Sequence, residues 1–142
     1  MTTTIIVVGV DGSPDSARAV AWAAETASAL GARVVAVHAV GMLEHQRGDP
    51  AGAHLMPEME AWTRALEELP SARVERRLVP ADPVTALMTV AAEENAGLVV
   101  VGTRGVGSRG VGADAGTALG STSLHLAERS LGALVIVPPS TW

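Results

Sequence analysis

The sequence predicts a single-domain α/β protein, residues 1–142, whose five parallel strands form a doubly wound sheet in the order 3-2-1-4-5 with helices on both faces. Three observations lead to this fold class. Short apolar runs alternate with helix-like segments along the chain. The apolar runs are nearly continuous, as in strands that are covered on both faces. Right-handed crossovers then leave few arrangements for strands and helices that alternate in this way.

The first part of the chain contains two predicted strands with a helix between them. Residues 4–10, TIIVVGV, and residues 33–40, RVVAVHAV, are apolar and rich in β-branched side chains. Between them, Ser13 is suited to cap a helix whose first residue is Pro14, and Gly31 is suited to end it. These residues predict a strand–helix–strand unit.

The rest of the chain continues the alternation after a loop-like stretch over residues 41–56. Arg76 and Arg77 lie in a segment where polar and apolar residues alternate, which indicates an edge strand with solvated charges. Proline and cap residues mark the helix starts. In order, we expect a helix over 57–69, a strand over 72–79, a helix over 82–95, a strand over 97–101, a helix from Ser121 to about Leu131 and a strand over 133–137.

The composition excludes several classes of protein. The absence of cysteine excludes disulfides, zinc–thiolate sites and thiol nucleophiles, which fits a cytoplasmic location. All ten basic residues are arginine, which excludes a Walker-type lysine and a Schiff base. The net charge of −5 argues against nucleic-acid binding. The N-terminus does not resemble a signal peptide, and no apolar run is long enough to span a membrane.

A glycine-rich stretch follows the fourth predicted strand. Seven of the 21 residues from Gly102 to Thr122 are glycine, and the stretch contains the near-repeat GTRGV–GSRGV. In the predicted sheet, the strand order reverses between strands one and four, where ligands bind at the carboxyl ends of the strands. Glycine amides followed by a helix N-terminus at Ser121 are typical of an anion site, and phosphate is the natural anion.

Two familiar phosphate-binding motifs do not account for this stretch. Gly105, Gly107 and Gly110 spell GxGxxG, but that motif normally follows the first strand and opens a helix at once. A P-loop would need lysine after its last glycine, where this chain has Val111.

A third pattern, Gly107-x₂-Gly110-x₉-Gly120-Ser121, resembles the nucleotide-binding signature of the universal stress protein family. The resemblance extends along the chain, through VVGVDGSPDSARAVAWAAETA, VHAV, LVVVGTRG, GSTSLHLAERS and LVIVPP. It implies a parallel α/β sandwich that is usually dimeric, and many members of the family bind ATP.

The resemblance also implies roles for individual residues. Asp11 would lie near the ribose or a phosphate-bound Mg²⁺, and the backbone at Ala39 would meet the adenine. The chain departs from the family pattern, because one GxRGV unit looks duplicated and the signature lies five residues further from the strand. The phosphates would be held by glycine amides and by hydroxyl-bearing residues, namely Gly102, Gly105, Gly107, Gly110, Gly120, Ser121, Thr122 and Ser123.

Three polar residues near the predicted cleft leave alternatives open. Asp11 has no evident structural duty, because Ser13 already caps the helix, which favours a functional role. His38 ends a buried strand and is expected to be hydrogen-bonded in the core rather than a ligand. His125 follows Ser121 by four residues, so a nucleophile–base pair is conceivable, but packing or a phosphate-side role is favoured because no acid partner is evident.

The resemblance, with the glycine-rich stretch beside it, implies an ATP-binding regulatory protein of the stress response, with at most slow hydrolysis and no identified catalytic residue. The short apolar strand over 133–137 is expected at a sheet edge, where antiparallel pairing would form a homodimer. One alternative is a dimeric interaction module of the same fold that binds no nucleotide. A further alternative is a nucleotide hydrolase or transferase.

Overall fold

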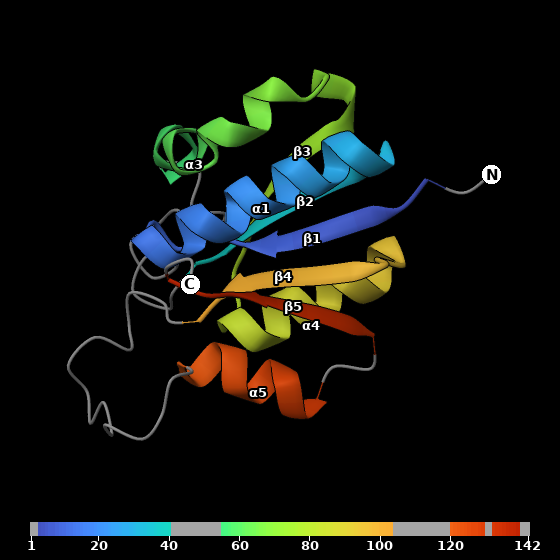
Figure 1. Ribbon diagram of the computed structural model, residues 1–142. Helices are drawn as coiled ribbons and strands as arrows, with labels where there is room; N and C mark the ends of the chain where they lie inside the picture. The colour runs from blue at the N-terminus through green and yellow to red at the C-terminus, as the bar shows by residue number, and fades with distance from the viewer. Residues whose placement is uncertain (1–2, 41–54, 104–119, 130–131, 140–142) are drawn as a thin grey trace.

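The computed structural model describes residues 3–40, 55–103, 120–129 and 132–139, which form a parallel sheet covered by helices on both faces (Figure 1). The five strands follow the order β3-β2-β1-β4-β5, and all four pairings are parallel. The predicted fold class and strand order are therefore confirmed. The order reverses between β1 and β4, because β2 and β3 add on one side of β1, and β4 and β5 add on the other.

The strands in the middle of the sheet are the most deeply buried. Val7 lies opposite Val35 of β2 on one side and opposite Val99 of β4 on the other, and all three are buried. β3 and β5 lie at the two edges and are mostly half-buried. The strand bounds are β1 Ile5–Gly9, β2 Arg33–Ala39, β3 Val74–Val79, β4 Leu98–Gly102 and β5 Ala133–Val137.

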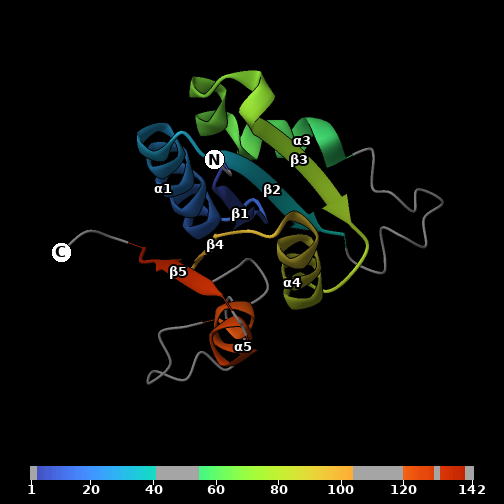
Figure 2. The same ribbon diagram turned by 90° about the vertical axis from the view of Figure 1, so that its right-hand side faces the viewer.

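The helices pack against two separate apolar layers, one on each face of the sheet. Helix α1, Pro14–Leu30, and helix α3, Met56–Trp62, cover one face. Helix α4, Pro83–Glu94, and helix α5, Ser121–Arg129, cover the other. Figure 2 shows α1 and α4 on opposite sides of the central strands. Ser13 caps α1, Pro14 is its first residue and Gly31 ends it in a left-handed conformation, as expected from the sequence.

The helix predicted over residues 57–69 is interrupted, contrary to the expectation of one continuous helix. α3 ends at Trp62, and short 3₁₀ helices follow at Arg64–Glu68 and Ser71–Arg73. The buried Thr63 donates its hydroxyl to the Met59 carbonyl at 2.6 Å and accepts a hydrogen bond from Arg76 Nε at 2.7 Å. At the break the Thr63 carbonyl accepts from the Leu66 N–H at 2.9 Å in a 3₁₀ pattern, and Arg76 Nη2 lies 3.5 Å from the same carbonyl.

The same contact corrects the expectation that Arg76 is a solvated edge charge. Arg76 lies on the α3 side of β3 and is partly buried against Thr63. Arg77 points to the other face, where its guanidinium pairs with Glu93 at 2.9 Å and with Glu94 at 3.6 Å. Only Arg77 therefore behaves as the charged edge residue that the sequence suggested.

Asp82 caps α4, and its replacement provides a test of the local fold. The Thr85 hydroxyl and then the Thr85 N–H, at 2.6 and 3.0 Å, lower the pKa of Asp82 from its ordinary 3.8. Asp82→Ala is expected to cost about 1 kcal/mol of unfolding free energy at pH 7, because the cap is lost. Because the pKa of Asp82 is lowered in the folded state, its charge adds to the free energy of unfolding above pH 3.8. This contribution is lost as the pH falls through the lowered pKa.

Urea unfolding of Asp82→Ala and Asp82→Asn at neutral and acidic pH measures the contribution of the cap hydrogen bonds and the contribution of the charge. Asparagine keeps an oxygen that can accept from the Thr85 N–H but loses the second oxygen, which accepts from the Thr85 hydroxyl, so Asp82→Asn should retain most of the cap. The pH-dependent part should be small, because the carboxylate is exposed and screened by solvent. Equal losses in the two variants would show that the hydrogen-bonding cap is not the source of the stability.

Candidate functional site

A cleft lies at the carboxyl ends of β1, β2 and β4, at the point where the strand order reverses. The space between its lining residues is about 560 Å³ when the part open to solvent is included. The cleft therefore lies where the topology predicts a ligand site. The lining residues are Gly9, Val10, Asp11, Ser16, Val37, His38, Ala39, Pro83, Ala86, Leu87, Val101, Gly102, Thr122 and Ser123.

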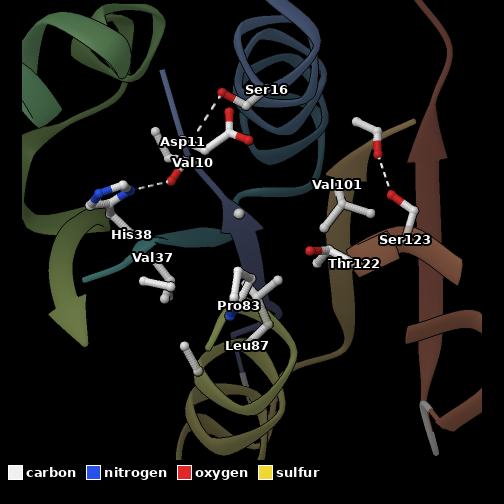
Figure 3. A pocket seen from close by; sticks show the side chains of 14 residues that line it. Val10, Asp11, Ser16, Val37, His38, Pro83, Leu87, Val101, Thr122 and Ser123 are labelled. Carbon is white, nitrogen blue, oxygen red and sulfur yellow. Dashed lines mark hydrogen bonds between the residues drawn. The ribbon is translucent and has the colours of Figure 1, made fainter. Parts of the chain in front are cut away.

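The cleft has an apolar side and a polar side (Figure 3). Val37 of β2 and the Pro83 and Leu87 side chains of α4 gather on the apolar side. Thr122 and Ser123, in the first turn of α5, lie on the facing side next to Val101. Together with Gly102 at the end of β4, whose carbonyl accepts from Ser123, they form what we call the polar wall. This division suits a ligand with an apolar ring system at one end and polar or anionic groups at the other.

Asp11 lies in the turn between β1 and α1 and has a structural duty, contrary to the expectation from the sequence. Its Oδ1 accepts a hydrogen bond from the Ser13 N–H at 2.9 Å, and its own N–H donates to Ser16 Oγ at 3.3 Å. A carboxylate that accepts from the backbone two residues on stabilises the turn. Because Asp11 also lines the cleft, the turn fixes its carboxylate at the edge of the site.

The turn after β1 is supported from behind by Trp62 and His38. Gly12 has φ of +80°, and a Cβ there would lie only 2.7 Å from Trp62 Cε2. The rings of Trp62 and His38 meet edge to face, with their centroids 5.1 Å apart. His38 Nδ1 lies 2.7 Å from the Val10 carbonyl, which can only accept, so Nδ1 carries the proton. His38 is hydrogen-bonded as predicted, and it also borders the cleft.

The role of Trp62 could not be found from the sequence. Fifty residues separate Trp62 from Gly12 in the chain, and neither residue lies in a motif that pairs them. The nearest signal is that Gly12 follows Asp11 directly at the end of a predicted strand, where a left-handed turn is common.

The backbone of Ala39 borders the cleft beyond the end of β1. The Val10 N–H donates to the Val37 carbonyl at 2.9 Å, so the backbone groups of Val37 face β1. Residues two apart in a strand turn their N–H and C=O groups to the same side. The N–H and C=O of Ala39 therefore point to the same side of β2 as those of Val37, at a level beyond Val10, where they border the cleft. The Val10 carbonyl accepts a hydrogen bond from His38.

The start of α5 differs slightly from the sequence prediction. The Leu124 N–H donates to the Gly120 carbonyl at 3.0 Å, so Gly120 rather than Ser121 precedes the first helical turn. Thr122 and the buried Ser123 line the cleft, whereas Gly120 and Ser121 are not among its described lining residues. The predicted contributions of Gly105, Gly107 and Gly110 lie outside the described residues.

Among the described residues, the site has neither a close nucleophile–base pair nor a group of protein ligands for a metal ion. Ser121 Oγ lies 3.5 Å from His125 Nδ1, which is long for a hydrogen bond, on an exposed part of α5. In the ranges that the structure describes, no three His, Cys, Asp or Glu side chains gather as metal ligands. Nor does any helix within those ranges have the length and apolar character needed to cross a membrane.

Known proteins of one family match this chain over nearly its whole length. The model of the universal stress protein family matches residues 2–138. A universal stress protein of Mycobacterium tuberculosis is 33% identical over 144 aligned residues, covering 93% of this chain and 94% of that protein. One of Mycolicibacterium smegmatis is 31% identical over 94% of this chain, which spans only 45% of that longer protein.

Solved structures agree with the sequence relatives. A universal stress protein in complex with cAMP is 31% identical and superposes with a TM-score of 0.70, covering 99% of this chain and 100% of its own. The universal stress protein of Lactobacillus plantarum, at 18% identity, shares the fold with a TM-score of 0.77 over 96% of this chain and 99% of its own. The chain belongs to the universal stress protein family.

Proposed function

We propose that the chain is an ATP-binding regulatory protein of the stress response that holds the nucleotide in the cleft at the ends of β1, β2 and β4. The observation that carries this proposal is the meeting of an apolar side and a polar wall in one cleft at the sheet reversal. The complex of a 31% identical relative with cAMP supports an adenine nucleotide as the ligand class.

The adenine ring would lie on the apolar side of the cleft. Val37 and Leu87 are buried side chains there, and Pro83 adds a flat apolar surface at the start of α4. The N–H and C=O of Ala39 supply one donor and one acceptor, which match the edge of adenine. A base that presents the opposite pattern on that edge would lose these bonds.

The phosphates would lie against the polar wall. The first turn of α5 offers backbone N–H groups, the positive end of the helix dipole and the Thr122 hydroxyl. The amides of Gly105, Gly107 and Gly110 are expected to complete the phosphate site. Asp11 would either help to hold Mg²⁺ next to the phosphates or lie near the ribose; one carboxylate is enough for Mg²⁺, which usually keeps several of its water ligands.

Calorimetric titration with ATP, with and without Mg²⁺, tests the proposal. We expect saturable binding of one nucleotide per chain, with adenosine binding more weakly because it lacks the phosphates. cAMP and AMP in the same series define how many phosphates the site prefers. The absence of heat with all four ligands would reject nucleotide binding and leave an interaction module of the same fold.

Replacement of Asp11 separates its structural and ligand-binding duties. Asp11→Asn keeps an oxygen that can accept from Ser13 N–H but removes the charge, whereas Asp11→Ala removes both. Both variants should weaken Mg·ATP binding by about tenfold or more, the value of one hydrogen bond to a charged group. Only Asp11→Ala should also lower the melting temperature.

The titration repeated without Mg²⁺ distinguishes the two roles that Asp11 could have. A loss of affinity that disappears without Mg²⁺ assigns Asp11 to the metal, and a loss that persists assigns it to the ribose. Unchanged Mg·ATP binding by Asp11→Asn would contradict a ligand contact of either kind.

We further propose a homodimer formed by antiparallel pairing of β5 across a twofold axis. β5 lies at the sheet edge, is apolar throughout and is at most half-buried, so its outer backbone groups invite a second strand. Light scattering at micromolar concentration should give twice the chain mass of 14.5 kDa. A measured mass of one chain at micromolar concentration would contradict the dimer.

A further inference from the structure

We infer that Asp15, Thr103 and Ser123 form a clasp that fixes the polar wall of the cleft and thereby sets the affinity for the phosphate part of the ligand. In this role Asp15 and Thr103 are positioning residues, because neither is among the described residues that line the cleft. The inference rests on the proposed nucleotide binding, which it deepens by assigning the source of phosphate affinity.

The clasp joins three segments that are distant in the sequence. Thr103 Oγ1, just beyond β4, donates to Asp15 Oδ2 in the first turn of α1 at 3.1 Å. Ser123 Oγ, in the first turn of α5, donates to the Gly102 carbonyl at 2.6 Å. Together these bonds connect the start of α1, the end of β4 and the start of α5.

The side chains of the clasp are held in place by burial and by charge. Ser123 is 3% exposed, so its hydroxyl needs the Gly102 carbonyl as a partner. The side chain of Asp15 is only 17% exposed, and Arg18 lies 3.3 Å from its Oδ1. With one oxygen directed to Arg18 and the other to Thr103, the carboxylate has a defined orientation.

Close packing of α1 against β4 brings these groups together. A Cβ added to Gly102 would lie 2.7 Å from the Asp15 carbonyl oxygen. The backbones of the two segments therefore touch at this point, which only glycine allows. This close contact is a structural reason for glycine at position 102, in addition to the ligand contact expected from the sequence.

The clasp also closes the ends of the glycine-rich stretch. The Gly120 N–H donates to the Thr103 carbonyl at 2.6 Å, so the residues on either side of positions 104–119 are bonded directly to each other. A change of length between two joined ends alters the closure entropy only slightly. The polar wall should therefore keep its geometry when the repeated GxRGV unit is removed.

A pair of substitutions at Thr103 tests whether the clasp acts on phosphate affinity. Thr103→Val has nearly the same shape but no hydroxyl to donate to Asp15, and Thr103→Ser restores the hydroxyl. By calorimetry we expect Thr103→Val to weaken ATP binding by about tenfold and adenosine binding by less than about twofold. Thr103→Ser should remain close to the parent protein for both ligands.

If Thr103→Val weakens ATP and adenosine binding equally, the substitution loosens the whole cleft, and the inference is wrong. The inference is also wrong if Thr103→Val changes the affinity for neither ligand. If the unaltered protein binds neither ligand, the proposed function fails, and the clasp is then judged by amide hydrogen exchange. The Gly120 amide should be protected in the parent and in a variant lacking residues 107–111, and should exchange faster in Thr103→Val. An unprotected Gly120 amide in the parent protein would overturn the clasp itself.

Discussion

Leu126→Ala is expected to lower the free energy of unfolding by about 2–5 kcal/mol, the range for a large side chain removed from a core. Leu126 is 1% exposed and packs in the apolar layer between the sheet and α4. In the described part of α5, the buried residues are Ser123 and Leu126, so Leu126 is the main apolar anchor of this helix. Urea denaturation of the purified variant measures the loss.

The same variant should weaken nucleotide binding, because α5 carries Thr122 and Ser123 of the polar wall. Leu124→Ala is the matched control, since Leu124 belongs to the same helix but is 39% exposed. Its effect should stay within about 0.5 kcal/mol. Equal destabilisation by both substitutions would mean that helix propensity, and not the contact of α5 with the sheet, determines the stability.

Gly102→Ala is expected to destabilise the protein by about 1–3 kcal/mol, the usual cost of overpacking a close contact. The added methyl group would meet the backbone of Asp15 at 2.7 Å, and a backbone cannot move aside as a flexible side chain can. The expected shift of α1 away from β4 would also lengthen the Asp15–Thr103 bond. ATP binding should therefore fall together with the melting temperature.

Gly132→Ala provides the control for Gly102→Ala. No heavy atom beyond its chain neighbours lies within 4 Å of a Cβ added at Gly132, so the methyl group has room. Calorimetric melting should show a clear decrease for Gly102→Ala and little change for Gly132→Ala. A melting temperature for Gly102→Ala equal to that of the parent would contradict the close approach of α1 and β4.

The regular elements of the fold could be predicted because their signals are local. Ser13 and Asp82 cap the two longest described helices, each with proline as the first helical residue, and every strand except β3 is a nearly unbroken apolar run. The break after Trp62 could not be predicted, because the local sequence continues as an amphipathic helix with no glycine or proline at the break. The contact of Arg76 with Thr63, which accompanies the break, forms only once β3 lies beside α3.

The position of the cleft could be predicted from topology, whereas its detailed contacts could not. Strand order places the ends of β1 and β4 together, so Asp11 and Gly102 could be assigned to one cleft before any geometry was known. The bond of Asp11 to Ser13 N–H and the bond of Ser123 to Gly102 depend on the side-chain orientation. Sequence patterns specify residue types and spacing, and they do not specify which of several partners a short polar side chain selects.

Backbone amide NMR during a titration with Mg·ATP tests most directly whether this cleft holds the nucleotide. We predict that the largest shift changes occur at Asp11, Ala39, Gly102 and Thr122, which border the cleft from four different segments. Absent changes, or changes confined to the apolar hollow near Met88 and Gly132 between α4 and the start of β5, would contradict it.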